Sequence, residues 1–575
     1  MDSDPAGPGD RLSSLEDSVL GHILSFLPAA EAARAAVLSR RWRHVFAAVH
    51  TLSFDEPERG DRDRYGYADE DTYSVWSSDY SASGWGCGDP VGRRYDLAAP
   101  PFVTGVTAAL LGRHRGRHVP AAPPIRALRV ALAEFREGAS AQLVNVWLSY
   151  AVHQAAGELH IDLRLGRRPI CLREYALRRR RHAVEVNAGD KEDSTMYEHE
   201  DEPDRDAAGD EEEDPDDGDD MGEDGYSSSS PYLGPGDARH VVYVAPRSLF
   251  SCAVLRTLRL GPCRLDPPAA VDLPSLHTLH LTSITGVNSP VQRLVAGCPR
   301  LADLTLEACA TVTTLSLLDA RLRRLALRCC HGLASIAVDS SELREFEYRG
   351  AAPAPAFLTM HGPCVVSSCT LDFCGEEPGG EPSEPARLAC FLRPLAGTET
   401  LHLKSAHLLA GIYTEALPVM AALRSLELTG MLPEDDATAA VVTAVTTVLE
   451  RTPSLETLSL FFLPGPEDPV RDHGYYYHDT LHAAHHLRYN RYTEVTVPEG
   501  GTTIPCLRET TREINLVHYQ GGMAQRTLAK FLLRNAAVTG EVFCGFALGP
   551  LWMQTGLMEE IRGWAMNKSA NMMFF

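Results

Sequence analysis

The chain has 575 residues, 44% of them hydrophobic, and a formal net charge of −23. That length is enough for about two to four domains and a large apolar core. It has no uncharged run of about 18 residues and no basic segment ahead of an apolar one at the N-terminus, so we expect neither a membrane span nor a secretory signal. We therefore expect the nucleus or the cytoplasm, where its 14 cysteines stay reduced.

A small helical domain is predicted for residues 10–50, after a disordered N-terminus of residues 1–9. Pro28 separates two amphipathic helices, because proline ends a helix. Together they carry more apolar surface than about 40 residues can hide, which is typical of a docking module. The first helix has apolar residues at i, i+3, i+4 and i+7, namely Leu20, Ile23, Leu24 and Leu27. The second has Leu38, Trp42, Val45, Phe46 and Val49 on one side.

The next three segments differ sharply in composition. Residues 55–100 are rich in Asp, Gly, Ser and Tyr and are predicted to be a low-complexity linker. Residues 101–186 contain strand-like spacing and are expected to start a repeat solenoid, whereas residues 187–238 are expected to be a disordered acidic insertion in it. Residues 190–224 alone contain 20 acidic and two basic residues, a net charge of −18 out of −23, and a segment so charged cannot offset the entropy of ordering.

Residues 239–463 repeat the frame L-x-x-L-x-L. Successive copies are 21, 25 and 21 residues apart, within the range of leucine-rich repeats, whose short strands stack so that neighbours bury each other's apolar residues. The frames begin at Leu255, Leu276, Leu301 and Leu322, with degenerate copies at Leu343, Leu423 and Leu455. Half-period copies at Val312, Leu315, Leu317 and at Leu333, Ile336, Val338 predict a second short strand per repeat.

The C-terminal part is expected to close this stack. A polar connector is predicted at 464–500 and an α/β cap at 501–575. The cap should contain a strand at 513–519, a helix and a second strand at 541–546.

The N-terminal stretch "DRLSSLEDSVLGHILSFLPAAEAARAAVLSRRWRHVF" resembles the F-box of plant F-box/leucine-rich-repeat proteins. "SLFSCAVLRTLRL" and "CPRLADLTLEAC" resemble the repeats of that family, and "CLRETTREINLVHYQGG" is similar to its FBD-type ending. The chain departs from the family where Leu15-Glu16-Asp17 replaces Leu-Pro-Asp, and in the length of its acidic insertion. The resemblance implies an α/β fold in which a small helical F-box precedes a leucine-rich-repeat solenoid with an α/β cap.

The resemblance also implies a function. F-box proteins of this type are substrate-recognition subunits of cullin-based (SCF-type) ubiquitin ligases, in which the F-box binds a Skp-type adaptor and the repeats bind a target protein. Such a subunit is not an enzyme. The helix pattern by itself cannot separate residues that contact the adaptor from residues of the module's core. The F-box pattern implies that the residues that pack at or support the adaptor interface are Leu12, Leu15, Leu20, Ile23, Leu24, Leu27, Pro28, Val37, Leu38 and Trp42.

A candidate target-binding face follows from strand alternation in the repeats. Its basic side chains would suit an acidic partner or an anion, or the chain's own acidic tract. They are Arg256, Arg259, His277, His280, Arg323, Arg324 and Arg328.

Other signals leave their alternatives open. Arg178 to Arg181 have two interpretations: a patch for nuclear localisation or nucleic-acid binding, or a solvated strand end neutralised by the adjacent acidic residues. Because the net charge of the chain is negative, we do not expect nucleic acid as a partner. His478 and His482, with His485 and His486, have metal-ligand spacing, yet a polar connector explains them equally well. Without a phosphate loop or a catalytic motif, we expect no cofactor and no metal. A repeat scaffold that does not engage a ligase is the alternative function.

Overall fold

The computed structural model describes residues 15–35, 42–56, 101–113, 124–132, 139–163, 243–286, 289–351, 353–354, 356–373, 389–409, 417–432, 438–463, 486–497 and 504–575. The predictions for residues 1–9, for the acidic insertion 187–238 and for most of the linker and the connector therefore lie outside the described residues. No helix within the described ranges is long and apolar enough to cross a membrane.

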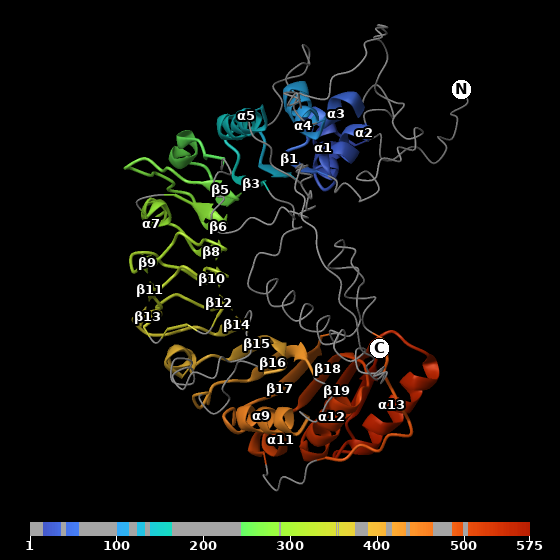
Figure 1. Ribbon diagram of the computed structural model, residues 1–575. Helices are drawn as coiled ribbons and strands as arrows, with labels where there is room; N and C mark the ends of the chain where they lie inside the picture. Colours follow the sequence, from blue (N-terminus) through green and yellow to red (C-terminus); the bar gives the residue numbers. More distant parts are fainter. Residues whose placement is uncertain are drawn as a thin grey trace, which may run out of the picture. The chain divides into compact units, whose positions relative to one another are not determined.

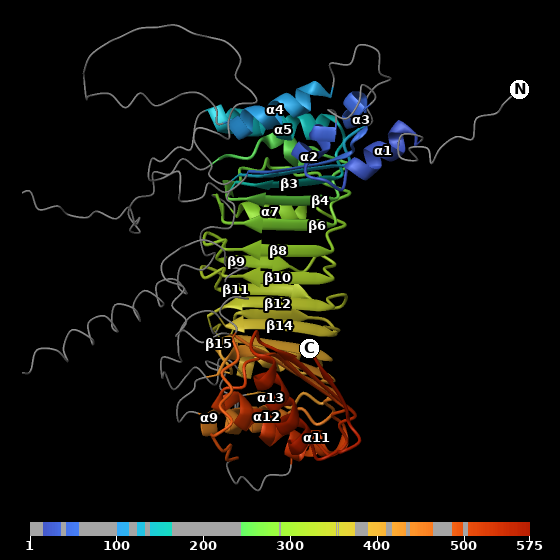
Figure 2. The same ribbon diagram turned by 90° about the vertical axis from the view of Figure 1, so that its right-hand side faces the viewer.

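The main structural element is a parallel β-sheet. In the described part of the chain it has fifteen strands, which follow the order of the sequence from one edge to the other. Figure 2 shows them lying one above another. The strands are β1 (Thr51–Asp55), β2 (Ala127–Ala131), β3 (Glu158–Asp162), β4 (Thr257–Gly261), β6 (Thr278–Thr282), β8 (Asp303–Glu307), β10 (Arg324–Arg328), β12 (Glu345–Gly350), β14 (Ser368–Phe373), β15 (Thr400–His407), β16 (Ser425–Met431), β17 (Thr457–Phe462), β18 (Glu513–Tyr519), β19 (Glu541–Phe546) and β20 (Asn571–Phe574).

Stacked leucines hold this sheet together. The second leucine of each frame lies opposite its counterpart on the next strand, so that Leu258, Leu279, Leu304 and Leu325 form one continuous row. All four are fully buried, because alternate side chains of a strand point to the same face. The predicted leucine-rich-repeat solenoid and its α/β class are confirmed.

A second layer covers the face of the sheet that carries these leucines (Figure 1). The half-period strands predicted from the sequence are β9 (Thr314–Leu317) and β11 (Ser335–Asp339), which form a small sheet with β13 (Leu358–His361). A two-stranded sheet joins β5 (Cys263–Arg264) and β7 (Ile284–Thr285). The helical elements of the layer are α4 (Pro101–Gly112), α5 (Ala139–His153), η3 (Arg247–Ser251), α7 (Pro290–Ala296), η4 (Arg393–Leu395), α9 (Thr438–Glu450), α11 (Pro505–Glu509), α12 (Met523–Asn535) and α13 (Leu551–Trp564).

The structure adds a strand that the sequence analysis does not predict. The solenoid was expected from residue 101, yet β1 directly follows the N-terminal helices and places Leu52 opposite Leu128 of β2. A single five-residue strand has no neighbouring copy in the sequence, so no period reveals it. Arg113, at the end of α4, is buried and donates hydrogen bonds to the carbonyl oxygens of Phe46 and Val49, which joins the last N-terminal helix to the repeats.

The C-terminal region continues the same sheet. The predicted strands 513–519 and 541–546 are confirmed as β18 and β19, with α12 between them. The structure adds α13 and β20, of which β20 pairs with β19. The cap is thus a further part of the parallel stack, held by the buried side chains of Tyr519 and Leu528.

Replacing Leu325 by Ala should lower the free energy of unfolding of the repeat stack by about 2–5 kcal/mol. The substitution leaves a cavity within the row of buried leucines, where the neighbouring side chains cannot fill it completely. The unfolding midpoint in urea measures the effect. Thr305→Ala, on the opposite face of the neighbouring strand, is the control and should change stability by less than about 0.5 kcal/mol. Equal losses from both substitutions would contradict the role assigned to the leucine row.

Candidate functional site

Three short helices form the N-terminal module: α1 (Asp17–Leu24), α2 (Ala29–Arg34) and α3 (Trp42–Ala48). Leu20 and Leu24 of α1 are buried together with Trp42 and Val45 of α3. The absence of a side chain at Gly21 allows α1 to approach Ala48 closely, since a Cβ there would lie 2.7 Å from the backbone of that residue.

A second apolar stripe on this module faces away from that core. Val19 (42% exposed), Ile23 (39%) and Leu27 (39%) recur every four residues and lie beside Phe26, which is 76% exposed. The Phe26 ring packs edge-on against His22 at 5.1 Å, which supports it on one side. Large apolar side chains grouped on a surface mark a protein interaction site.

The structure separates the predicted adaptor-binding residues into core and surface. Ile23, Leu27 and Pro28 are exposed, and Leu15 is partly buried. Leu20, Leu24 and Trp42 are buried in the core of the module, which leaves them only the supporting role of the two roles that the prediction left open. Leu12, Val37 and Leu38 lie outside the described residues.

The sequence analysis missed Val19 and Phe26. The apolar spacing predicts one helix face that contains Leu20 and Leu24, and Val19 lies beside that face. Phe26 follows the end of α1, where the helical period no longer applies. The signal that could have identified Val19 is its spacing of four residues from Ile23, which places both on one side of the helix.

The other candidate surface is the face of the main sheet opposite the leucines, here called the open face. No helix or strand of the described residues packs on it (Figure 1). Its charged side chains pair between neighbouring strands. Glu347 of β12 accepts two hydrogen bonds from Arg328 of β10, at 2.6 and 2.9 Å, and lies 3.5 Å from Arg324. Further pairs join His280 to Glu307, Arg349 to Asp372 and His402 to Glu427.

The pair of Arg328 and Glu347 changes the pKa values of both its members. Burial alone would raise the pKa of Glu347, but the hydrogen bond and charge of Arg328, with a smaller contribution from Arg324, outweigh it and lower the pKa. The same hydrogen bond raises the pKa of Arg328. Burial, followed by the charges of Arg259 and other neighbours, lowers the pKa of His160 to about 4, so this open-face imidazole is neutral at pH 7.

The predicted target-binding residues fall into two groups. Arg259, His280, Arg324 and Arg328 lie on strands and project from the open face; His280, Arg324 and Arg328 make ion pairs there. Arg256, His277 and Arg323 each precede a strand and lie along the edge of the sheet where the strands begin.

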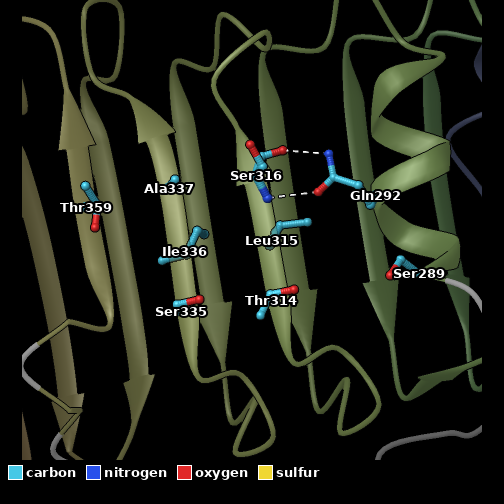
Figure 3. Close-up of a pocket in the computed structure, with 9 residues that line it drawn as sticks. All are labelled: Ser289, Gln292, Thr314, Leu315, Ser316, Ser335, Ile336, Ala337 and Thr359. Carbon is cyan, nitrogen blue, oxygen red and sulfur yellow. Dashed lines mark hydrogen bonds between the residues drawn. The ribbon is translucent and has the colours of Figure 1, made fainter.

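The outer layer contains a shallow hollow of about 530 Å³. Figure 3 shows its floor of side chains from β9, β11 and β13 and its wall from α7. The Gln292 carboxamide donates to the Ser316 carbonyl and accepts from the Ser316 N–H, both at 2.8 Å. Gln292 thus occupies the hydrogen-bonding edge of β9, as a neighbouring strand would.

Two cysteines that follow repeat strands support the turns after them. Cys309 donates to the Glu307 carbonyl and Cys330 to the Leu306 carbonyl, both at 3.4 Å. No cluster of potential metal ligands occurs among the described residues. His478, His482 and His485 lie outside them, whereas His486 is described.

Replacing Glu347 by Gln should lower the thermal unfolding midpoint at neutral pH, by an amount equivalent to about 1 kcal/mol, because Arg324 and Arg328 lose their shared carboxylate. Because the pKa of Glu347 is lower in the folded protein than its ordinary value of 4.5, the ionised carboxylate stabilises the fold at a pH above 4.5. This stabilisation is lost as the pH falls through the lowered pKa. The difference in unfolding midpoint between wild type and variant should therefore narrow as the pH falls below the ordinary value of 4.5 and through the lowered pKa of Glu347. Glu345→Gln, a more exposed and looser partner of Arg324, is the control. A difference that does not vary with pH would contradict the assignment.

Comparisons with known proteins match the two parts of the chain separately. The F-box domain model matches residues 12–52, and the model described as "FBD-associated F-box protein At5g56370, LRR repeats" matches residues 235–354. The F-box/LRR-repeat protein At3g59200 of Arabidopsis thaliana is 54% identical over 52 residues, which cover 9% of this chain and 10% of the relative. The F-box protein At3g59000 of the same plant is 48% identical over 60 residues, covering 10% and 12%. The chain thus spans about a tenth of the length of these curated relatives. It combines an F-box domain with leucine-rich repeats of the kind found in FBD-associated F-box proteins.

Proposed function

We propose that this chain is a non-catalytic target-recognition subunit of a cullin-based (SCF-type) ubiquitin ligase. Its F-box binds a Skp-type adaptor, and its repeats hold a target protein. Tethering the target near the ubiquitin-charged enzyme raises the effective concentration of the target and requires no catalytic residue on this chain.

The exposed apolar stripe of the F-box carries this proposal. A domain of this size gains stability by burying Val19, Ile23, Phe26 and Leu27, and their exposure is explained if a partner covers them. Grouped apolar side chains that become fully buried on binding supply most of the energy of such interfaces.

The departure from Leu-Pro-Asp does not disturb this stripe. Glu16 has φ −66° and ψ 151°, a backbone conformation that proline itself adopts, and its carbonyl accepts the first helical hydrogen bond from Leu20. The helix therefore starts as it would with proline. This supports adaptor binding over the alternative of a repeat scaffold that does not engage the ligase.

Replacing Phe26 by Asp should weaken binding of a purified Skp-type adaptor by about thirtyfold or more, because a charge replaces the most exposed apolar side chain of the stripe. Isothermal titration calorimetry with the full chain measures the dissociation constant. Phe26 is a better choice than Leu24 or Trp42, since their substitution would unfold the module.

Val254→Asp is the control, because Val254 is also an exposed apolar residue but belongs to the repeats. It should leave the affinity unchanged. Wild-type protein that fails to bind the adaptor would refute the ligase role and favour the scaffold. Equal affinity of the Phe26 variant would refute the stripe as the interface.

A further inference from the structure

One row of basic residues remains after the charges of the open face have been paired. Each lies at the position immediately before a strand, along the edge where the strands begin (Figure 2). We call this row the basic rim; it consists of Arg126, Arg256, His277, Arg323 and Arg344.

The backbone fixes the spacing of the basic rim. His277 N–H donates to the Arg256 carbonyl at 2.8 Å, and Arg344 N–H donates to the Arg323 carbonyl at 2.9 Å. Gly157 and Ala302 occupy the same position on the strands between them and complete the ladder. From β2 to β12 the row extends over six strand spacings of about 4.8 Å, or about 29 Å.

The arginines of the basic rim are exposed and have no ion pair with any described residue. The acidic residues nearest to them on the open face are already engaged. Glu158 contacts Arg129 at 3.3 Å, Asp303 accepts a hydrogen bond from Thr278 at 3.1 Å, and Glu345 contacts Arg324 at 3.7 Å. The arginines of the rim therefore keep their positive charge beside a face on which Glu158 and Glu345 are paired with other arginines.

The charges along the same edge differ between β15 and β18. There the equivalent positions are Glu399, Arg424, Glu456 and Arg512, and Arg424 pairs with Glu456. Acidic and basic residues alternate, so their charges compensate. The uncompensated charge is thus confined to the edge between β2 and β12, and a row of like charges attracts a ligand of opposite sign.

We infer that the basic rim is a docking site for an extended acidic segment of a partner protein. An extended chain rises about 3.3 Å per residue, so about nine residues would span the rim. Guanidinium groups bind carboxylates through paired hydrogen bonds, which suits Asp and Glu side chains. A nucleic-acid duplex is wider and would also contact the carboxylates of Glu158, Asp303 and Glu345 beside the rim, which would repel it.

This inference rests on the proposed function, because it names the class of target that the repeats present. Its test does not use the adaptor, so the two can fail separately. The probe is a fluorescein-labelled nonapeptide of alternating Glu and Gly, titrated with the full chain in about 50 mM salt and followed by fluorescence anisotropy.

The informative variant carries Arg256→Glu, Arg323→Glu and Arg344→Glu. Binding of the probe should weaken by about thirtyfold or more, because three attractive charges become repulsive. The control carries Arg393→Glu, Arg508→Glu and Arg534→Glu, three exposed arginines away from this edge with the same change in total charge. It should weaken binding by less than about threefold. If the first variant does not fold, the corresponding Arg→Gln triple replaces it, with the same ranking expected.

Other outcomes would overturn the inference. They are no binding by the wild-type chain, equal loss in both triple variants, or equal rim-dependent binding of a single-stranded oligonucleotide of the same charge. Binding that appears only after removal of residues 190–224 would favour the chain's own acidic tract as the occupant. Phe26→Asp should leave probe binding intact, so loss of adaptor binding alone would refute the ligase role and not the docking site.

Discussion

The structure depends on the burial of leucines between neighbouring parallel strands. Leu258, Leu279, Leu304 and Leu325 lie in register, and none could be covered within its own repeat. Because side chains alternate along a strand, this burial decides which residues project from the opposite face and which stand at its edge. Any site on the repeats is therefore placed by the leucine register.

The two surfaces created by this register have different electrostatics. On the open face, opposite charges on adjacent strands are close enough to pair, as Arg328 and Glu347 do. Such pairs stabilise the sheet and occupy groups that a ligand would otherwise meet. At the edge, the arginines stand at equivalent positions of successive repeats and so have other cationic groups, Gly or Ala as neighbours. The edge with its row of arginines is therefore narrower than the whole open face.

The N-terminal module differs from the repeats, because part of its apolar surface is not buried. Leu20, Leu24 and Trp42 hold the helices together, whereas Ile23 and Phe26 stand outside this core. The connection to the repeats is made by β1 and by Arg113, which links α4 to the carboxyl end of α3. The module that carries the exposed apolar stripe is thus attached directly to the first strand of the stack.

Periodicity in the sequence by itself determined the leucine-rich-repeat fold, the half-period strands β9 and β11, and the strand, helix and strand of the C-terminal region. Each of these is a local pattern of apolar residues that one type of secondary structure satisfies. Only the tertiary structure showed that β1 belongs to the sheet, that Phe26 is exposed while Leu24 is buried, and that Arg324 and Arg328 both pair with Glu347. These depend on which strands and helices become neighbours in space, and the contacts join residues about twenty positions or more apart.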